Sequence, residues 1–434
     1  MLVLLAPVPA VLGMASRTSA ARRFASPRTT RAVSAAPVLR AARAGRPLWH
    51  GFAAGATTSA SAGGTRTLIS DDPSNNVTPY IEKLVGRNLH LIPNHPLFII
   101  KRKIEGYFAE LGISFEIFDS LDPVVTCTAC FDDLNIPPGH PARKPSDTYY
   151  LSEGTLLRTH TSAHQSELMR RGHERFLCTG DVYRRDEIDA SHYPAFHQME
   201  GVRLMDVADM PAQLSRDEWL ASDACARTAA ELKGTLEGLV DALFGPVEKR
   251  WVEAYFPFTE PSLELEIFFQ GDWLEVLGCG VIHSEVLAKC GLEHRHGWAF
   301  GLGLERLAMI LFSIPDIRLF WTEDTRFTSQ FASGEVVKFQ PYSKYPECYK
   351  DVAFFVPETW EENDFMELCR ECGGDLMENV KMIDEFTNPK SGKRSLCYRI
   401  VYRSMDRSLT NEEVDEIQFQ LREKVGPKLG VELR

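Results

Sequence analysis

Hydrophobic residues recur at helical spacing in four stretches of the central part of the chain. The pattern predicts a helix within residues 88–111, opened by His95-Pro96, and another over 162–171 after a Thr/Ser cap. A longer helix ends at Gly245-Pro246, and a fourth follows Gly303. The last two periodic faces consist of Leu232, Leu236, Leu239, Val240 and Leu243, and of Leu304, Leu307, Ala308, Leu311 and Phe312.

Several shorter runs have the character of β-strands. Residues 176–184 (FLCTGDVYR) and 196–204 (FHQMEGVRL) are predicted to be two strands on either side of a polar loop, 185–195. Residues 263–269 (LELEIFF) alternate between apolar and charged side chains, and 273–281 form a further strand. Successive strands are joined by loops as well as by helices. The pattern therefore predicts an α+β fold, a mainly antiparallel sheet with flanking helices, and not a doubly wound parallel sheet.

A second, smaller unit is predicted over residues 333–434. Strands are expected at 350–356, 380–386, 396–402 and 431–433, with one helix over 363–372. Thr410 and Glu413 form a capping box that opens the other helix. The order β-α-β-β-α-β is the ferredoxin-like arrangement, and about 100 residues is enough for a domain.

The composition is that of an ordinary globular protein. Of the 434 residues, 44% are hydrophobic and 25% are charged, which excludes collagen-like, coiled-coil and wholly disordered chains. No apolar run is long enough to predict a transmembrane helix, so no membrane partner is expected. The net charge of −12 taken alone makes a nucleic-acid partner unfavourable.

The charges are unevenly distributed along the chain. Nine arginines and no lysine precede Asp71, the first acidic residue, and Ala, Ser and Thr fill most of the remainder. This composition predicts an organellar transit peptide, disordered and cleaved, over residues 1–67, for the mitochondrial matrix with plastid or dual targeting left open. The alternatives are a disordered basic arm and a secretory signal in the apolar first 15 residues.

The polar loop and its flanking strands carry the first candidate chemistry. Arg184, Arg185 and His192 lie in or beside the loop, while Gln198 and Glu200 share one face of the second strand. An arginine, an amide and a carboxylate on a sheet surface can bind a zwitterion and a phosphate group. A solvated hairpin with surface salt bridges is the alternative.

Two further strings add to this pattern. In AFGLGLER, residues 299–306, the glycines allow a flat ligand to approach the backbone, and Arg306 lies in the first turn of the following helix. A bare Gly-x-Gly is weak, and Gly303 can simply cap that helix. In LLRTHTSAHQ, residues 156–165, His160 and Ser162 could equally form a structural pair.

Together these strings resemble motifs 2 and 3 of the class II aminoacyl-tRNA synthetases. RTHTSAHQ, GDVYRRDEIDASHYPAFHQMEG, YFPFTEPS, WLEVLGCGV and WAFGLGLERLAM, in this order, are similar to the single-chain organellar phenylalanyl-tRNA synthetases. The resemblance covers residues 75–434. It implies a catalytic domain over 68–332, an anticodon-binding domain over 333–434, and a monomer that joins phenylalanine to tRNA(Phe) with ATP and Mg²⁺.

The resemblance also implies roles for individual residues. Arg184 and Arg306 would hold the phosphates of ATP with His192 beside them, Phe196 would stack on adenine, Gly301 would line the nucleotide site, and Glu275 would chelate Mg²⁺. The residues expected around phenylalanine are His160, Ser162, Ala163, His164, Gln165, Arg184, Ser191, His192, Tyr193, Gln198, Met199, Glu200, Phe256, Phe258, Glu275, Ala299 and Phe300. Asp186 stands where many class II enzymes have glutamate.

A basic strip qualifies the unfavourable net charge. Residues 381–407 contain seven basic and three acidic side chains, and span a predicted hairpin that can follow phosphates. Lys390, Lys393 and Arg394 are the expected tRNA contacts, although an exposed hairpin with solvated charges is the alternative. For the whole chain, a biotin/lipoyl-type adenylate-forming ligase and a non-catalytic, synthetase-derived RNA-binding protein also remain open.

Overall fold

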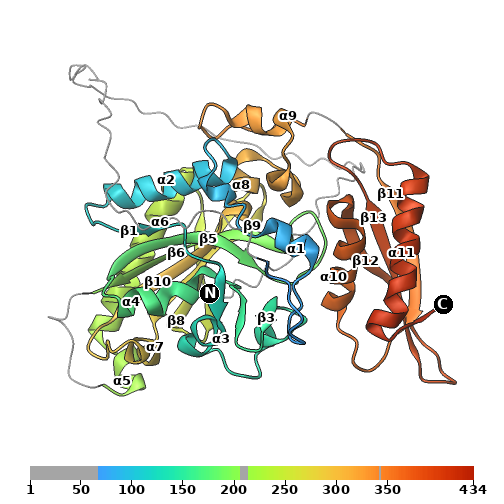
Figure 1. The fold of residues 1–434 in the computed structure, drawn as a ribbon. Helices are drawn as coiled ribbons and strands as arrows, with labels where there is room; N and C mark the ends of the chain where they lie inside the picture. The colour runs from blue at the N-terminus through green and yellow to red at the C-terminus, as the bar shows by residue number, and fades with distance from the viewer. Residues whose placement is uncertain (1–66, 206–213, 342–343) are drawn as a thin grey trace, which may run out of the picture. The chain divides into compact units, whose positions relative to one another are not determined.

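The computed structural model describes residues 67–205, 214–341 and 344–434 (Figure 1). Residues Thr67–Arg434 belong to one compact unit. The expected leader over residues 1–67 lies outside the described residues, apart from Thr67. Within the described ranges, no helix combines the length and apolar character needed to cross a membrane.

A seven-stranded sheet forms the centre of the larger part of the molecule. Its order is β1-β5-β6-β10-β9-β8-β7, and every neighbouring pair is antiparallel except β1 with β5. The antiparallel α+β architecture expected from the sequence is confirmed. The strands are β1 (Glu116–Phe118), β5 (Arg175–Tyr183), β6 (Ala195–Leu204), β7 (Lys249–Phe256), β8 (Thr259–Phe269), β9 (Asp272–Ile282) and β10 (Gly297–Gly303).

Helices cover both faces of this sheet and create two hydrophobic cores (Figure 1). On one face, α2 (Pro96–Glu110), α6 (Asp223–Phe244) and α8 (Leu304–Phe312) pack over a core that contains Phe108, Leu236 and Leu307. On the other face lie α3 (Cys127–Cys130), α4 (Gln165–Arg170) and α7 (Ser284–Lys289). The remaining elements here are α1 (Pro79–Leu84), α5 (Arg216–Leu220), α9 (Thr325–Thr328) and a small sheet of β2 (Val124–Thr126), β4 (Thr155–Leu157) and β3 (Tyr150–Ser152).

The ends of the helices follow local chemistry. The Ser222 side chain accepts a hydrogen bond from the Cys225 amide at the start of α6, and Gly245, with φ +73°, ends the helix. The expected helix over 162–171 is divided, because a 3₁₀ turn at Thr161–His164 precedes α4. This turn lets polar side chains before α4 face the sheet.

The carboxy-terminal unit has the predicted β-α-β-β-α-β order. Its sheet order is β12-β13-β11-β14, and the core includes Phe354, Tyr398 and Leu421. Both halves of the capping box at Thr410 and Glu413 form. The elements are β11 (Cys348–Phe355), α10 (Glu362–Gly373), β12 (Met377–Thr387), β13 (Arg394–Tyr402), α11 (Asn411–Leu429) and β14 (Glu432–Leu433).

Candidate active site

A row of four residues crosses the middle of the large sheet. Glu200 in β6 pairs with Gly301 in β10, Gly301 pairs with Gly278 in β9, and Gly278 pairs with Glu264 in β8. Directly paired residues project from the same face of a sheet. The row therefore has a carboxylate at each end and two glycines between them, so that its middle is bare backbone.

Several buried polar groups near Glu200 have no hydrogen-bond partner of good geometry among the described residues. They are His160 Nδ1, both amide atoms of Gln165 and both carboxylate oxygens of Glu200, although the Ser162 and Thr161 side chains lie close enough to Glu200 to lower its pKa by hydrogen bonding. Gln198 differs, because its Oε1 accepts the Thr161 amide at 3.4 Å. Buried polar atoms are nearly always hydrogen-bonded. A group of buried polar atoms without good partners on one face therefore indicates a site for a polar ligand.

Glu200 is strongly perturbed by its surroundings. Burial raises the pKa of its carboxyl group to about 7, because the charged form loses its hydration. A ligand ammonium placed beside it would restore the favourable environment of the carboxylate. Glu200 is therefore suited to bind a cationic group.

An aromatic wall lies on the same side of the sheet. The rings of Phe256 and Phe258 stack at 6.0 Å with an angle of 17° between their planes, and the His160 ring lies 6.5 Å from Phe258. Ala163 and Ala299 belong to the same buried cluster. These side chains provide an apolar surface beside the orphaned polar groups.

Two of the expected pocket residues are corrected by the structure. Phe300 and Met199 belong to the core on the opposite face of the sheet. The Phe300 ring stacks on Phe108 at 5.5 Å, with 7° between the ring planes. Successive residues of a strand point to opposite faces, so Ala299 and Glu200 can face a ligand only if Phe300 and Met199 do not.

Arg184 occupies a second part of the site. Its Nε donates to the Thr159 carbonyl at 2.8 Å, and its guanidinium lies 5.1 Å from the centre of the Phe196 ring. Burial lowers the pKa of Arg184, although the group remains a cation at neutral pH. The arginine and the ring expected to stack on adenine are thus held together.

Arg306 and Glu275 form a third part. Arg306 Nη1 lies 3.5 Å from Glu275 Oε2, and Glu275 Oε1 is buried without a partner among the described residues. Burial raises the pKa of Glu275 to about 7, Arg306 acts against this shift, and Glu264 and Glu266 reinforce it. An orphaned carboxylate oxygen close to two further carboxylates fits the oxygen-ligand preference of a hard divalent cation.

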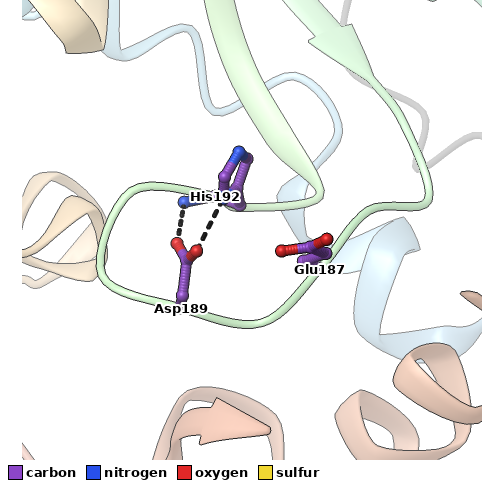
Figure 2. Close-up of side chains that lie close together, drawn as sticks. All are labelled: Glu187, Asp189 and His192. Carbon is purple, nitrogen blue, oxygen red and sulfur yellow. Dashed lines mark hydrogen bonds and ion pairs between the residues drawn. The ribbon is translucent and has the colours of Figure 1, made fainter. Parts of the chain in front are cut away.

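The polar loop between β5 and β6 holds His192 in a defined position (Figure 2). Asp189 Oδ1 accepts hydrogen bonds from both the amide and the hydroxyl of Ser191 and from the His192 amide, while Oδ2 receives His192 Nδ1 at 2.8 Å. Burial works against the charge on His192, but Asp189 and Asp186 raise its pKa. Glu187 completes a set of potential metal ligands, but Asp189 is already satisfied within the loop.

Two other expected residues have structural partners. His164 Nε2 lies 2.9 Å from Arg158 Nη1, and Arg158 forms a fully buried ion pair with Asp181 at 2.6 Å. The Tyr193 hydroxyl donates to Asp375 Oδ1 at 2.7 Å, and its ring stacks on Trp321 at 5.2 Å. Both residues support the loop and strands around the site.

The same loop contacts the carboxy-terminal unit. Arg370 of α10 donates to the carbonyls of Asp186 and Glu187. The Val380 amide donates to the Ile188 carbonyl at 3.0 Å, and Ile188 belongs to the core of the carboxy-terminal unit. The backbone that leads to His192 is therefore anchored from outside the large sheet.

A buried link joins the strand that follows the polar loop to the start of α8, and it was not predicted from the sequence. Glu305 Oε2 accepts the His197 amide at 2.8 Å, and Oε1 receives His197 Nδ1 at 2.7 Å. Glu305 directly precedes Arg306, and His197 lies between Phe196 and Gln198. The only sequence signal was that both residues belong to the strings that carried the resemblance.

Comparison with known proteins agrees with this geometry. Residues 81–331 match the model of the tRNA synthetases class II core domain (F), and residues 343–434 match the ferredoxin-fold anticodon binding domain. The fold and site therefore define a class II aminoacyl-tRNA synthetase. A chloroplastic/mitochondrial phenylalanine–tRNA ligase of Arabidopsis thaliana is 55% identical, with 84% of each chain covered.

Other relatives point to the same family. A mitochondrial phenylalanine–tRNA ligase of Dictyostelium discoideum is 47% identical, covering 83% of this chain and 89% of the relative. One of Saccharomyces cerevisiae is 40% identical, covering 84% and 93%. The chain belongs to the phenylalanine–tRNA ligase family, which confirms the family resemblance found in the sequence.

The perturbed pKa of Glu200 predicts a pH dependence. If the ionised carboxylate binds the substrate ammonium, kcat/KM for the amino acid should fall about tenfold per pH unit below about 7. Pyrophosphate exchange at limiting amino acid and saturating ATP measures this profile. Glu200→Gln should give a low, flat profile; an acid limb unchanged in that variant contradicts the assignment.

The link between Glu305 and His197 predicts a separable effect on ATP. Glu305→Ala should lower kcat/KM for ATP by about 10²-fold. The bonds between Glu305 and His197 fix Arg306 and Phe196 relative to each other, and the substitution removes them. His197→Asn, whose amide can replace Nδ1–H, should retain far more activity than His197→Leu. Steady-state pyrophosphate exchange tests this, and circular dichroism measures the folded fraction of each variant. Loss that only tracks the folded fraction, with KM for ATP unchanged, would show a purely structural role.

Proposed function

We propose that the protein is a mitochondrial phenylalanine–tRNA ligase that forms phenylalanyl-adenylate and transfers the amino acid to tRNA(Phe). The observation that carries this proposal is the set of groups around one face of the sheet: a buried carboxylate, an aromatic wall and two half-buried guanidinium groups. These features complement an ammonium, a phenyl ring and phosphates. An expected leader over residues 1–67, a catalytic domain over 68–332, an anticodon-binding domain over 333–434 and a monomeric state belong to the same proposal.

The amino acid would lie across Gly301 and Gly278, the two glycines in the row of four residues, which we call the glycine row. Glu200 pairs with its ammonium, and Gln165 and Gln198 hydrogen-bond to its polar end with His160 and Ser162 beside them. The ring packs against Phe256 and Phe258, and Ala299 closes the pocket. Aromatic pairs of this kind contribute about 0.5–1.5 kcal/mol each beyond burial.

The nucleotide would lie next to it. Phe196 stacks on adenine, Gly301 leaves room for the nucleotide, Arg184 holds the α-phosphate, and Arg306 and His192 bind the outer phosphates. The carboxylate of the amino acid attacks the α-phosphate in line, and pyrophosphate leaves. No side chain acts as a nucleophile, since catalysis comes from positioning and charge neutralisation.

Glu275 and Glu264 are the residues that would hold Mg²⁺. The orphaned oxygen of Glu275, and the rise in its pKa caused by burial and the neighbouring carboxylates, are what a cation would relieve. A bound divalent ion supplies neutralisation of phosphate charge. Arg306 contacts Glu275, so its guanidinium group lies beside the proposed Mg²⁺ site.

Transfer to tRNA needs a second surface. The β12–β13 hairpin carries Lys390, Lys393 and Arg394, where Lys393 pairs with Glu432 and Arg394 with Glu385 in exposed salt bridges. Such exposed pairs are worth little, so a phosphate can displace the carboxylates at small cost. The hairpin is therefore the proposed tRNA contact.

Amino-acid-dependent pyrophosphate exchange with all twenty amino acids tests the proposed function. Phenylalanine should support exchange, and tyrosine should be activated about 10²-fold less efficiently, because an apolar pocket rejects an added hydroxyl only weakly. If none of the amino acids supports exchange but biotin or lipoate does, the adenylate-forming alternative is established. Exchange with no substrate would favour a non-catalytic RNA-binding protein.

Ala299→Gly is expected to enlarge the pocket. Ala299 is buried in the cluster of Phe256 and Phe258, so loss of its methyl group should admit para-substituted phenylalanines. The strand should lose only about 0.5–1 kcal/mol of stability. Ala195→Gly, in a strand but on the opposite core, is the matched control. Unchanged specificity in Ala299→Gly would refute the pocket assignment.

Neutralising the hairpin should separate the two steps. Replacing Lys390, Lys393 and Arg394 with glutamine should lower kcat/KM for tRNA by about tenfold or more and flatten its salt dependence. Pyrophosphate exchange should not change. The matched control replaces the exposed cations Arg102, Lys103 and Arg171. Equal loss of charging and exchange in the hairpin variant argues against this division of labour.

A further inference from the structure

A cavity of about 150 Å³ lies at the end of β5 and β6 that is remote from the His192 loop. Arg175 and Arg203 line it from the two strands, and Arg227 lines it from the first turns of α6. The Thr228 hydroxyl bonds to the Ala224 carbonyl at 2.8 Å and to His296 Nδ1 at 2.9 Å, which fixes the buried wall. The cavity is thus polar, and its wall is rigid.

The arginines are arranged at an electrostatic cost. Arg175 and Arg203 are direct partners in the β5–β6 ladder, and like charges opposite each other destabilise an antiparallel pair. Arg227 adds a third guanidinium. Arg175 and Arg227 are exposed and Arg203 is half-buried, so solvent screens part of this repulsion.

Only one carboxylate among the described residues pairs with any of the three arginines, namely Glu231 with Arg203. Glu174 pairs with Arg295 at 2.7 Å, and this pair lowers the pKa of Glu174, with a smaller contribution from Arg175. Among the described residues, Arg175 and Arg227 thus have no ion-pair partner, so both guanidinium groups can turn toward an anion in the cavity.

The geometry points to a second anion site, in which Arg175, Arg203 and Arg227 bind a phosphate group. Guanidinium groups bind tetrahedral oxyanions through paired N–H donors, and an anion removes the repulsion between the opposed arginines. The cavity holds several water-sized volumes, which suits one phosphate and not a whole nucleotide. β5 separates Arg175 from Arg184 by nine residues, roughly 30 Å, so this site is not the nucleotide site.

A free phosphate and a phosphodiester of RNA share this chemistry. The first measurement is thermal unfolding of the full chain in sodium phosphate and in sodium chloride at equal ionic strength. The variant is Arg175→Gln/Arg227→Gln, and the matched control is Arg102→Gln/Arg171→Gln, which removes two exposed arginines elsewhere. General salt effects and phosphate binding in the nucleotide site are common to all three proteins.

The proposed site predicts that the difference in stability between the variant and the wild type changes sign between chloride and phosphate. In chloride, the Arg175→Gln/Arg227→Gln variant should be at least as stable as the wild type, because like-charge repulsion is relieved. In phosphate, it should have the lower unfolding temperature, since only the wild type gains from binding. The control should follow the wild type in both buffers. An equal phosphate-dependent shift in variant and wild type would overturn the proposal.

Binding of tRNA then distinguishes the source of the phosphate. If the site takes a phosphodiester, the slope of log K against log salt should fall by about one in the Arg175→Gln/Arg227→Gln variant. An unchanged slope together with the reversal in phosphate identifies a free phosphate or phosphomonoester. Loss of both the reversal and the slope difference excludes a phosphate ligand of either kind.

Discussion

The register between β6 and β10 is the constraint on which the site depends. It places Gln198 opposite Gly303 and Glu200 opposite Gly301. Because side chains alternate along a strand, a slip of one residue would turn Glu200 into the core and bring Met199 to the ligand face. The bonds from His197 to Glu305 fix this register from within the core, and they do so beside Arg306.

The site keeps its charges away from water before any substrate arrives. Glu200 is buried and Arg184 is half-buried, and loss of hydration displaces the pKa of each group in the direction that disfavours its charge. The folded protein bears this cost because fixed, dehydrated charges need little reorganisation when an ammonium or a phosphate binds. The neighbouring ion pair of Arg158 and Asp181 differs, since its charges satisfy each other and serve the framework alone.

Much of the fold could be predicted because it follows local patterns. The alternation in LELEIFF predicted β8, and the capping box at Thr410 predicted the start of α11. β7 was not expected, since the charged residues Lys249, Arg250 and Glu253 break up the apolar pattern of this edge strand. The 3₁₀ turn before α4 also went unpredicted, because only the tertiary position of His160 and Gln165 explains it.

The candidate site was predictable to the extent that its residues cluster in short strings. Those strings could not show which neighbours face the ligand, and so Phe300 and Met199 were assigned to the wrong side of the sheet. Nor could they show the pairing of His197 with Glu305, which are 108 residues apart in sequence. The partners of Tyr193 and His164 likewise depend on distant elements.

The glycine row has a consequence for how such a protein can diversify. With the amino acid placed as we propose, Gly301 and Gly278 would present main chain to it, so any side chain added there would remove space. New side-chain chemistry must therefore come from the walls, at positions such as Ala299 and Phe258. The surface that supports the reacting groups and the surface that selects the amino acid are encoded separately.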